Sequence, residues 1–265
     1  MDDVLYQTQG AVAVITLNRP QTLNSLTRRM HQQLGVAFDR IAGDRSVRAA
    51  VLTGAGRGFC AGADLSEFDI EPGPELMERA NPGPVIEEAF NPTIRKLQAL
   101  PVPTVAAVNG VAAGAGASLA MGCDLAVAAP TATFVQAFSR IGLVPDAGGS
   151  WFLVHKAGLA RAMGAAMLGD RLSAADAKNW GLIWDVAPDD EDCLAAAMRL
   201  AGRLAALPTQ ALVQTRNVLR AAVTNNLDRQ LDVERETQSS LGFTDDYIEG
   251  VQAFLQKRPP TFGGV

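Results

Sequence analysis

The chain has 265 residues, of which 48% are hydrophobic and 19% charged, a composition typical of a globular protein that can bury a sizeable core. Its 23 basic and 28 acidic residues leave a formal net charge of -5 without a basic run, so nucleic acid is not expected to be the principal partner. From this size and composition we expect one compact α/β domain. Three scattered cysteines cannot form a disulfide framework or a metal cluster, so a reducing cytoplasm is expected.

Two stretches bear on export and on membranes. Residues 1–4 are acidic where a signal peptide would be basic, so no targeting segment is expected. Residues 101–123 carry no charge and are long enough to cross a bilayer, for which about 20 apolar residues suffice. Asn109-Gly110 interrupts this stretch, and Ala and Gly dominate it, so we predict buried protein interior and no membrane association.

The first predicted strands are short apolar runs. Residues 12–17 predict a strand that ends at Asn18-Arg19-Pro20, because proline removes a backbone donor. Residues 49–52 predict a second, buried strand, which runs directly into a glycine-rich turn at 54–58.

A helix is predicted between these two strands. Its N-cap is Ser25 or Thr27, and Gly43-Asp44 ends it. The apolar positions recur at helical spacing: Met30, Leu34, Phe38 and Ile41.

Residues 66–84 interrupt the alternation of strands and helices. They combine acidic residues and prolines with little apolar periodicity, so we expect an exposed, partly mobile segment. A helix follows at 85–99, and a strand at 104–108 leads to a glycine turn that opens a helix near Gly114. A further strand is predicted at 124–128.

Helices dominate from Ser173 onward. Ser173 and Asp176 have the spacing of a capping box, in which each side chain satisfies the other residue's amide. Amphipathic helices are predicted at 190–206, 209–224, 228–240 and 245–257.

Two glycine-rich turns, 60–64 and 114–116, are the strongest candidates for a functional site. Each follows a buried strand, and the second opens a helix, so unpaired backbone N–H groups are expected at the strand ends. Such donors stabilise a developing oxyanion, commonly by about 3 kcal/mol each. For either turn alone, glycine serving only close packing is the better interpretation; the pair favours an oxyanion site.

A dinucleotide site is the alternative interpretation of the glycines. Gly54-Ala55-Gly56 and Gly114-Ala115-Gly116 both begin the Gly-x-Gly-x-x-Gly fingerprint. Phe59 and Leu119 replace its third glycine, and no clear ribose-binding acid follows about 20 residues on. The sequence therefore does not favour a Rossmann domain.

Three ordered segments carry a resemblance to a known family. Residues 59–65 (FCAGADL), 107–116 (AVNGVAAGAG) and 142–149 (GLVPDAGG) are similar to the signature segments of the crotonase, or enoyl-CoA hydratase/isomerase, superfamily. Residues 17–20 and 254–258 extend the similarity to nearly the whole chain.

The resemblance implies a fold and a ligand. The implied fold is a spiral of ββα units, with a core at 1–190 and, at 191–265, a helical region through which family members form trimers or hexamers. The implied substrate is an acyl ester of coenzyme A, and no separate cofactor or metal is expected. The 66–84 segment would then line the acyl pocket.

Specific residues follow from the resemblance. The amides of Ala63 and Ala115 would receive the thioester oxygen, so that an enolate is the shared intermediate. Asp64 is also expected to bond turn amides. Lys257, at the end of the last helix, is equally well interpreted as a charged residue of a solvated helix end. The residues implied to bind substrate or coenzyme A are Arg19, Ala61, Gly62, Asp64, Leu65, Gly114 and Lys257.

The reaction depends on the acids near those amides. Hydratases of the family carry two glutamates at the positions of Ser118 and Phe138, which lack the carboxylates that water addition requires. Asp146 stands where several isomerases of the family place their catalytic aspartate; without the resemblance, an aspartate that forms its own turn would be the better interpretation. We therefore predict an isomerase that uses Asp146.

Within the superfamily, residues 138–151 and 180–184 are most similar to the branch that isomerises the ring 1,2-epoxide of phenylacetyl-CoA, with migration of enoyl-CoA double bonds as a second activity. Two alternatives stay open. One is an enoyl-CoA hydratase with an unexpected base, and the other is a non-catalytic member that binds acyl-CoA or RNA.

Other polar residues are expected to be structural. Asp124 is predicted to cap or end the helix before its strand, and His31 to lie on a polar helix face. His155 near a basic turn leaves little material for a Ser/His/Asp triad. Cys60 and Cys123 are expected to be buried and inert.

Overall fold

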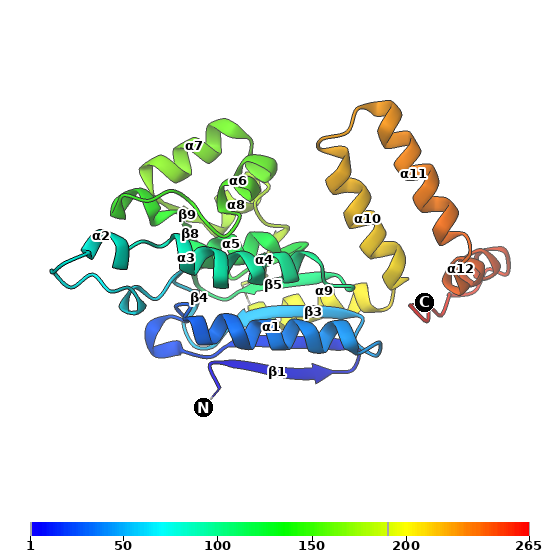
Figure 1. The fold of residues 1–265 in the computed structure, drawn as a ribbon. Helices are drawn as coiled ribbons and strands as arrows, with labels where there is room; N and C mark the ends of the chain where they lie inside the picture. The colour runs from blue at the N-terminus through cyan, green and yellow to red at the C-terminus, as the bar shows by residue number, and fades with distance from the viewer. Residues whose placement is uncertain (1, 190, 265) are drawn as a thin grey trace.

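Two β-sheets form the centre of the fold, which a computed structural model describes for residues 2–189 and 191–264 (Figure 1). The six-stranded sheet has the order β1-β2-β3-β5-β7-β10, and the four-stranded sheet has the order β4-β6-β8-β9. The strand bounds are β1 Val4–Gln9, β2 Val12–Leu17, β3 Ala49–Gly54, β4 Gly58–Cys60, β5 Thr104–Val108, β6 Val111–Ala113, β7 Leu125–Ala128, β8 Thr133–Val135, β9 Arg171–Ser173 and β10 Asp185–Val186.

Consecutive strands alternate between the two sheets. β3, β5 and β7 lie in the six-stranded sheet, and each is followed within a few residues by a strand of the other sheet, β4, β6 and β8. Helices follow each pair, which gives the predicted spiral of ββα units. Pairing is parallel except between β1 and β2 and between β8 and β9, so the carboxyl ends of several strands meet on one side.

The helix α1, Arg28–Gly43, forms as predicted. Thr27 is its N-cap, and its hydroxyl accepts a hydrogen bond from the amide of Met30 at 3.1 Å. The predicted apolar stripe faces the core: Met30, Leu34, Phe38 and Ile41 are all buried. Half of the predicted capping box is present: the hydroxyl of Ser173 accepts from the amide of Asp176 and caps α8, Ala174–Asn179, while the Asp176 carboxylate accepts from that hydroxyl at 2.6 Å instead of from the Ser173 amide.

The segment 66–84 is exposed or half-buried at every residue, as expected. It carries the short helix α2, Leu76–Arg79, which projects at one end of the molecule in Figure 1. Its predicted mobility stays a prediction. One continuous helical stretch follows, made of α3 Gly83–Val85, the π-helical turn η3 Ile86–Phe90 and α4 Asn91–Gln98.

Four helical elements lie between β6 and β9 in the chain. Their bounds are α5 Ala115–Gly122, η4 Ala137–Ile141, α6 Gly149–Ala157 and α7 Leu159–Leu168. The uncharged stretch 101–123 forms β5, β6 and α5 and is largely buried, as predicted. Across the described residues, no helix combines the length and the apolarity needed to cross a bilayer.

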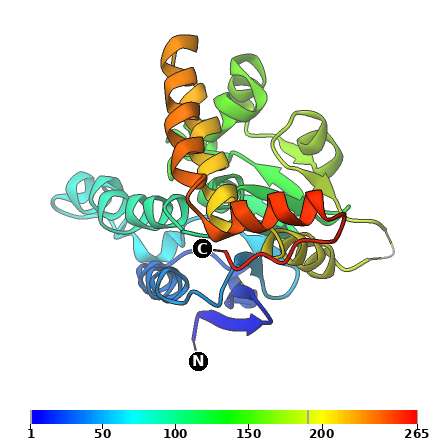
Figure 2. The same ribbon diagram turned by 90° about the vertical axis from the view of Figure 1, so that its right-hand side faces the viewer.

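The four predicted C-terminal helices are present, although the predicted start at residue 190 lies outside the described residues. They are α9 Cys193–Ala205, α10 Thr209–Ala222, α11 Leu227–Leu241 and α12 Asp245–Leu255. α9 packs on the six-stranded sheet, where Ala197 and Ala201 belong to one cluster with Val51 and Val105. α10, α11 and α12 extend away from this core (Figures 1 and 2). The predicted boundary at residue 190 between the core and the helical region stays a prediction. The helices that extend away from the core begin with α10, because α9 packs on the six-stranded sheet.

The prediction for Asp124 is wrong. Its carboxylate accepts from the amide of Thr104 at 2.9 Å and pairs with Arg216 at 3.1 Å and Arg220 at 3.3 Å, so it joins β5 to α10. A carboxylate cannot cap the preceding helix, because the free groups at a helix C-terminus are carbonyl oxygens.

The prediction for His31 is also wrong. Its side chain is buried because the π-helical turn and α4 cover this face of α1, with the Phe90 ring centroid 4.1 Å from that of the imidazole. Nδ1 lies 2.8 Å from the hydroxyl of Thr93, and burial lowers the pKa of the imidazole to about 4. His31 is a neutral core residue.

Replacing Gly116 by alanine tests the close approach of β4 to α5. A Cβ there would lie 2.2 Å from the carbonyl oxygen of Cys60, which is backbone and cannot move aside, so we expect a loss of about 1–3 kcal/mol in the free energy of unfolding. The matched control is Gly202→Ala on α9, where nothing lies within 4 Å and alanine is favoured by about 1 kcal/mol. Urea unfolding followed by circular dichroism measures both. Equal stability of the two variants would contradict the contact.

Candidate active site

The turn after β4 lies against the N-terminus of α5. A Cβ on Gly62 would lie 2.9 Å from the carbonyl oxygen of Ala113 and 3.6 Å from the amide nitrogen of Ala115. Gly62 also has a φ of +96°, which side chains rarely adopt. The two glycine-rich turns predicted from the sequence are therefore neighbours in space.

Two backbone amides at this contact are free. The amides on either side of Ala63 are used, since Ala61 donates to Leu23 and Asp64 donates to Leu26. Ala63 itself has no acceptor within the described part of the chain, and neither does Ala115, the first residue of α5. Both can donate to an oxygen from outside the chain, and the positive end of the α5 dipole favours an anion there.

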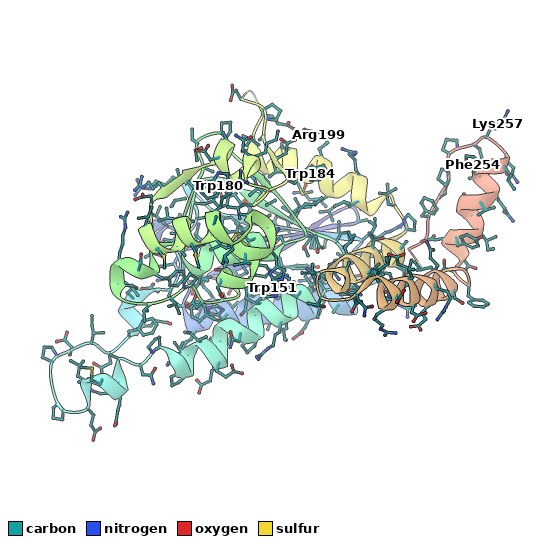
Figure 3. The ribbon with its side chains drawn as sticks, turned by 90° about the horizontal axis from the view of Figure 1, so that it is seen from above. Trp151, Trp180, Trp184, Arg199, Phe254 and Lys257 are labelled. Carbon is teal, nitrogen blue, oxygen red and sulfur yellow. The ribbon has the colours of Figure 1, made fainter. Side chains whose placement is uncertain are left out.

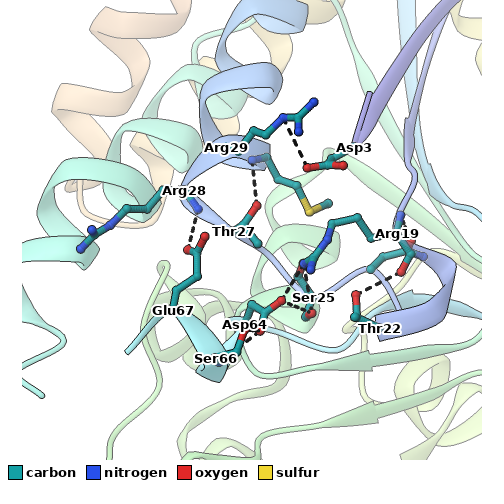
Figure 4. A network of polar contacts seen from close by, with 12 residues as sticks. Asp3, Arg19, Thr22, Ser25, Thr27, Arg28, Arg29, Asp64, Ser66 and Glu67 are labelled. Atoms are coloured by element: carbon teal, nitrogen blue, oxygen red, sulfur yellow. Dashed lines mark hydrogen bonds and ion pairs between the residues drawn. The ribbon is translucent and has the colours of Figure 1, made fainter. Parts of the chain in front are cut away.

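A polar network braces the first turn (Figure 4). The guanidinium of Arg19 donates to the carboxylate of Asp64 and to the carbonyl oxygen of Ser25, both at 2.7 Å. Burial alone would raise the pKa of Asp64, but hydrogen bonds from Ser66, Arg19 and Ser25 bring it down to about 2. Asp64 also accepts from the amide of Ser66 at 3.2 Å, which confirms its predicted bond to a turn amide.

The other residues expected to bind substrate lie in different places. Gly114 precedes Ala115 with a φ of +51°, and its amide donates to Val135. Leu65 begins the short η2 turn, Leu65–Glu67, and is 55% exposed beside the first turn. Lys257 follows α12, and Figure 3 shows it together with Phe254 far from Trp151. Figure 1 places α10 and α11 between α12 and α5, so this chain does not bring Lys257 to the free amides.

Asp146 lies in the turn that leads into α6. The two residues after it, Ala147 and Gly148, both have left-handed backbone with φ of +48° and +77°. One carboxylate oxygen of Asp146, Oδ1, is buried without a hydrogen-bond partner among the described residues. Burial raises the pKa of the carboxyl to about 6, against a small opposing effect of its own amide. A pKa near neutrality suits a group that takes up and releases a proton.

Ser118 and Phe138, which the sequence predicts to replace the two hydratase glutamates, both lie beside the second turn. Ser118 is fully buried on α5, and its hydroxyl lies 3.1 Å from the carbonyl oxygen of Asp146. The ring of Phe138 reaches within 3.5 Å of a Cβ placed on Gly114. The site therefore combines two free amides and one carboxylate, with a hydrocarbon ring beside the second turn.

The enoyl-CoA hydratase/isomerase family model matches residues 7–265. The chain belongs to this family. A relative from Escherichia coli K12, 1,2-epoxyphenylacetyl-CoA isomerase, is 48% identical over 100% of this chain and 99% of its own length. A Rhodobacter capsulatus protein named "probable enoyl-CoA hydratase" is 43% identical over 98% of both chains. The crystal structure of an enoyl-CoA hydratase from Polaromonas sp. JS666 superposes with a TM-score of 0.89 at 34% identity, covering 98% of this chain and 99% of that one.

These comparisons confirm the predicted family and the crotonase fold. The relatives of this enoyl-CoA hydratase/isomerase family member include an isomerase and hydratases, so membership shows the class of enzyme and leaves the reaction to the site. Sequence reasoning missed how Ser118 contacts the Asp146 turn, and it missed Gln136. The Gln136 side chain is buried, and its Oε1 lies 3.7 Å from a Cβ placed on Gly149. No motif marks the contact of Ser118, because it joins residues 28 positions apart in the chain.

The cysteine side chains are buried, and the second histidine stacks on a tryptophan. Cys60, Cys123 and Cys193 are buried and unpaired, and burial raises the pKa of each thiol to about 12, as expected for inert cysteines. The ring of His155 stacks on that of Trp151 with centroids 3.9 Å apart. Within the described residues, no group of three His, Cys, Asp or Glu side chains is arranged to hold a metal ion.

The raised pKa of Asp146 makes the stability of this enzyme depend on pH. Unfolding returns the pKa of the carboxyl from about 6 to its ordinary value near 3.8. The destabilising effect of the buried charge is therefore absent below pH 4, develops between pH 4 and 6, and is complete above pH 6. Asp146→Asn should therefore raise the free energy of unfolding at pH 8, by up to about 3 kcal/mol, and the gain should vanish near pH 4. Thermal unfolding from pH 4 to 8 measures it, with the exposed Asp2→Asn as control. A gain that is the same at both ends would show that Asp146 has an ordinary pKa.

Proposed function

We propose that this protein is a coenzyme A thioester isomerase in which the amides of Ala63 and Ala115 hold the thioester oxygen and Asp146 carries the proton. The observation that supports it most is Asp146 itself: a half-buried carboxyl with an oxygen that has no partner among the described residues, and with a pKa raised to about 6. Its turn is bonded to α5, the helix whose first amide is free.

The proposed mechanism needs only these groups. Two hydrogen bonds to the thioester oxygen draw charge from the adjacent carbon and acidify its protons. Asp146 removes one proton, and the negative charge moves to the oxygen as an enolate, which each amide stabilises by about 3 kcal/mol. Asp146 then returns the proton to a different carbon. The product has the atoms of the substrate, so no water or cofactor enters the balance.

Isomerisation is favoured over hydration by what surrounds Asp146. Water addition needs one group to activate water and another to deliver a proton, and each is worth about 10²- to 10⁴-fold in rate. The hydroxyl of Ser118 is directed to backbone carbonyl oxygens, and Phe138 offers only carbon atoms. One carboxyl that shuttles a proton is sufficient for isomerisation.

The substrate that we propose is 2-(1,2-epoxy-1,2-dihydrophenyl)acetyl-CoA, with 3-enoyl-CoA esters as a second class. The E. coli isomerase of the 1,2-epoxide, 48% identical over its whole length, supports this choice. The Phe138 ring beside Gly114 is also suited to contact an apolar acyl group.

The residues proposed to contact substrate or coenzyme A are Arg19, Ala61, Gly62, Asp64, Leu65, Gly114 and Lys257. The cytoplasm is the proposed location, since three unpaired cysteines fit a reducing compartment.

Asp146→Asn tests the catalytic assignment, because it keeps the shape of the side chain and removes the proton carrier. We expect isomerisation of the epoxide and of 3-enoyl-CoA to fall by about 10²- to 10⁴-fold, with kcat affected more than KM. Mass spectrometry of the products separates isomerisation, which leaves the mass unchanged, from hydration, which adds one water. Asp2→Asn, at an exposed position before β1, is the control. Full isomerase activity in Asp146→Asn, or rapid hydration of crotonyl-CoA by the native protein, would contradict the proposal.

We also propose that the chain assembles as a trimer or a dimer of trimers through α10–α12. These helices stand apart from the core and expose large apolar side chains, with Phe243 89% and Phe254 83% exposed. An arrangement in which a neighbouring copy brings Lys257 to the coenzyme A of this site is consistent with its distance from Ala115 within one chain.

Light scattering after size exclusion tests the assembly. We expect a mass of three or six chains of 27.9 kDa for the native protein. Phe254→Asp should shift it toward the monomer, because it would bury a charge in the interface. Val36→Asp, at a 69% exposed site on α1, is the control and should leave the mass unchanged. A native monomer at micromolar concentration would refute the assembly.

A further inference from the structure

The hydroxyl of Ser118 joins the two halves of the candidate site. Ser118 lies one helical turn after Ala115 on α5 and is fully buried. Its Oγ lies 3.1 Å from the carbonyl oxygen of Asp146 and 3.3 Å from that of Gly114. The carbonyl of Gly114 already accepts the amide of Ser118. The hydroxyl of Ser118 has one proton to donate, and we therefore assign it to the hydrogen bond with the carbonyl oxygen of Asp146.

Gly149 leaves the room that this hydroxyl occupies. A Cβ on Gly149 would lie 2.5 Å from the Oγ of Ser118. Gly149 is not among the glycines with positive φ and begins the regular helix α6, so its backbone does not require glycine. The absence of a side chain there is explained by the hydroxyl of Ser118.

The turn that carries Asp146 depends on such external contacts. Ala147 has a φ of +48°, a conformation that costs energy for a residue with a Cβ and persists only where its surroundings enforce it. The carbonyl oxygen of Asp146 receives two donors, the amide of Gly149 at 2.7 Å and the hydroxyl of Ser118 at 3.1 Å. The first bond lies within the turn, and the second anchors the turn to α5.

We propose that Ser118 is a positioning residue that holds the Asp146 turn in register with the amide of Ala115. Proton carrier and oxyanion donor then belong to one rigid unit, in which the distance between them is set by one turn of α5. Ser118 is fully buried and acts through Asp146 rather than on the substrate. The inference rests on the proposed function, because it assigns Ser118 a role toward Asp146 as the base.

Ser118→Ala removes the donor and retains the Cβ. We expect kcat to fall about 10-fold with KM within about two-fold, because the base is displaced while substrate binding is retained. The same change in the Asp146→Asn background should have no further effect on the residual rate. An equal fall in both backgrounds would show a general structural role and overturn the proposal.

Gly149→Ala supplies an independent test. Alone, it should lower the thermal midpoint and kcat more than Ser118→Ala does, because its Cβ would meet the Oγ of Ser118. In the double variant the hydroxyl is absent, so both quantities should return to the level of Ser118→Ala. Additive losses in the double variant would overturn the proposal.

These outcomes are distinguishable from a failure of the proposed function. Full isomerase activity of Asp146→Asn would contradict both the assignment of Asp146 as the base and the positioning role of Ser118. If Asp146→Asn is inactive, an unchanged kcat in Ser118→Ala overturns only the positioning role. The thermal midpoints of the Gly149 and Ser118 variants show whether the contact exists, whatever the substrate.

Discussion

The close approach of two backbone segments is the constraint on which the site depends. The end of β4 and the start of α5 touch so closely that a Cβ on Gly116 would lie 2.2 Å from a carbonyl oxygen of the other segment. At that distance only glycine fits, and the amides of Ala63 and Ala115 beside this contact have no partners in the described chain. The absence of side chains at this contact is what allows the two turns that carry these amides to lie against each other.

The alternation of strands between two sheets explains why this contact arises. β3 and β5 are neighbours in the six-stranded sheet, and the short strands that follow them, β4 and β6, pair in the other sheet. The same unit is repeated, so the turn after β4 and the helix after β6 occupy equivalent positions side by side. The third unit, β7 and β8, continues through η4 to Asp146. Each part of the candidate site therefore comes from a different turn of the spiral.

The elements that depend on local chemistry could be predicted from the sequence, including the cap at Thr27 and the buried strands β3 and β5. The three-residue strands β4, β6 and β8 were missed, because no periodicity can develop over so few residues and their pairing is set by the spiral. Asp124 and His31 were assigned wrongly because their contacts, too, are set by the fold and not by the neighbouring sequence. Their surroundings come from α10 and α4, which lie far away in the chain.

For the candidate site, spacing and resemblance identified which residues to examine but not how they are held. The glycine turns and Asp146 stand in recognisable motifs, whereas the bond from Ser118 to the Asp146 turn joins residues 28 positions apart. The orphaned oxygen of Asp146 is a property of three-dimensional burial and has no sequence signal. The proposed contact of Lys257 with coenzyme A depends on the proposed assembly, because α12 and the free amides lie apart within one chain.

The burial of all three cysteines determines how the protein meets the thiol chemistry of its proposed ligand. Coenzyme A freed from its esters is itself a thiol, and its oxidised forms exchange with protein thiolates to give mixed disulfides. Exchange requires an accessible thiolate, and each cysteine here is enclosed, with its pKa raised to about 12. None of these three cysteines therefore offers a reactive thiolate to oxidised coenzyme A, and we expect a shift in the redox state of the coenzyme A pool to leave them unmodified.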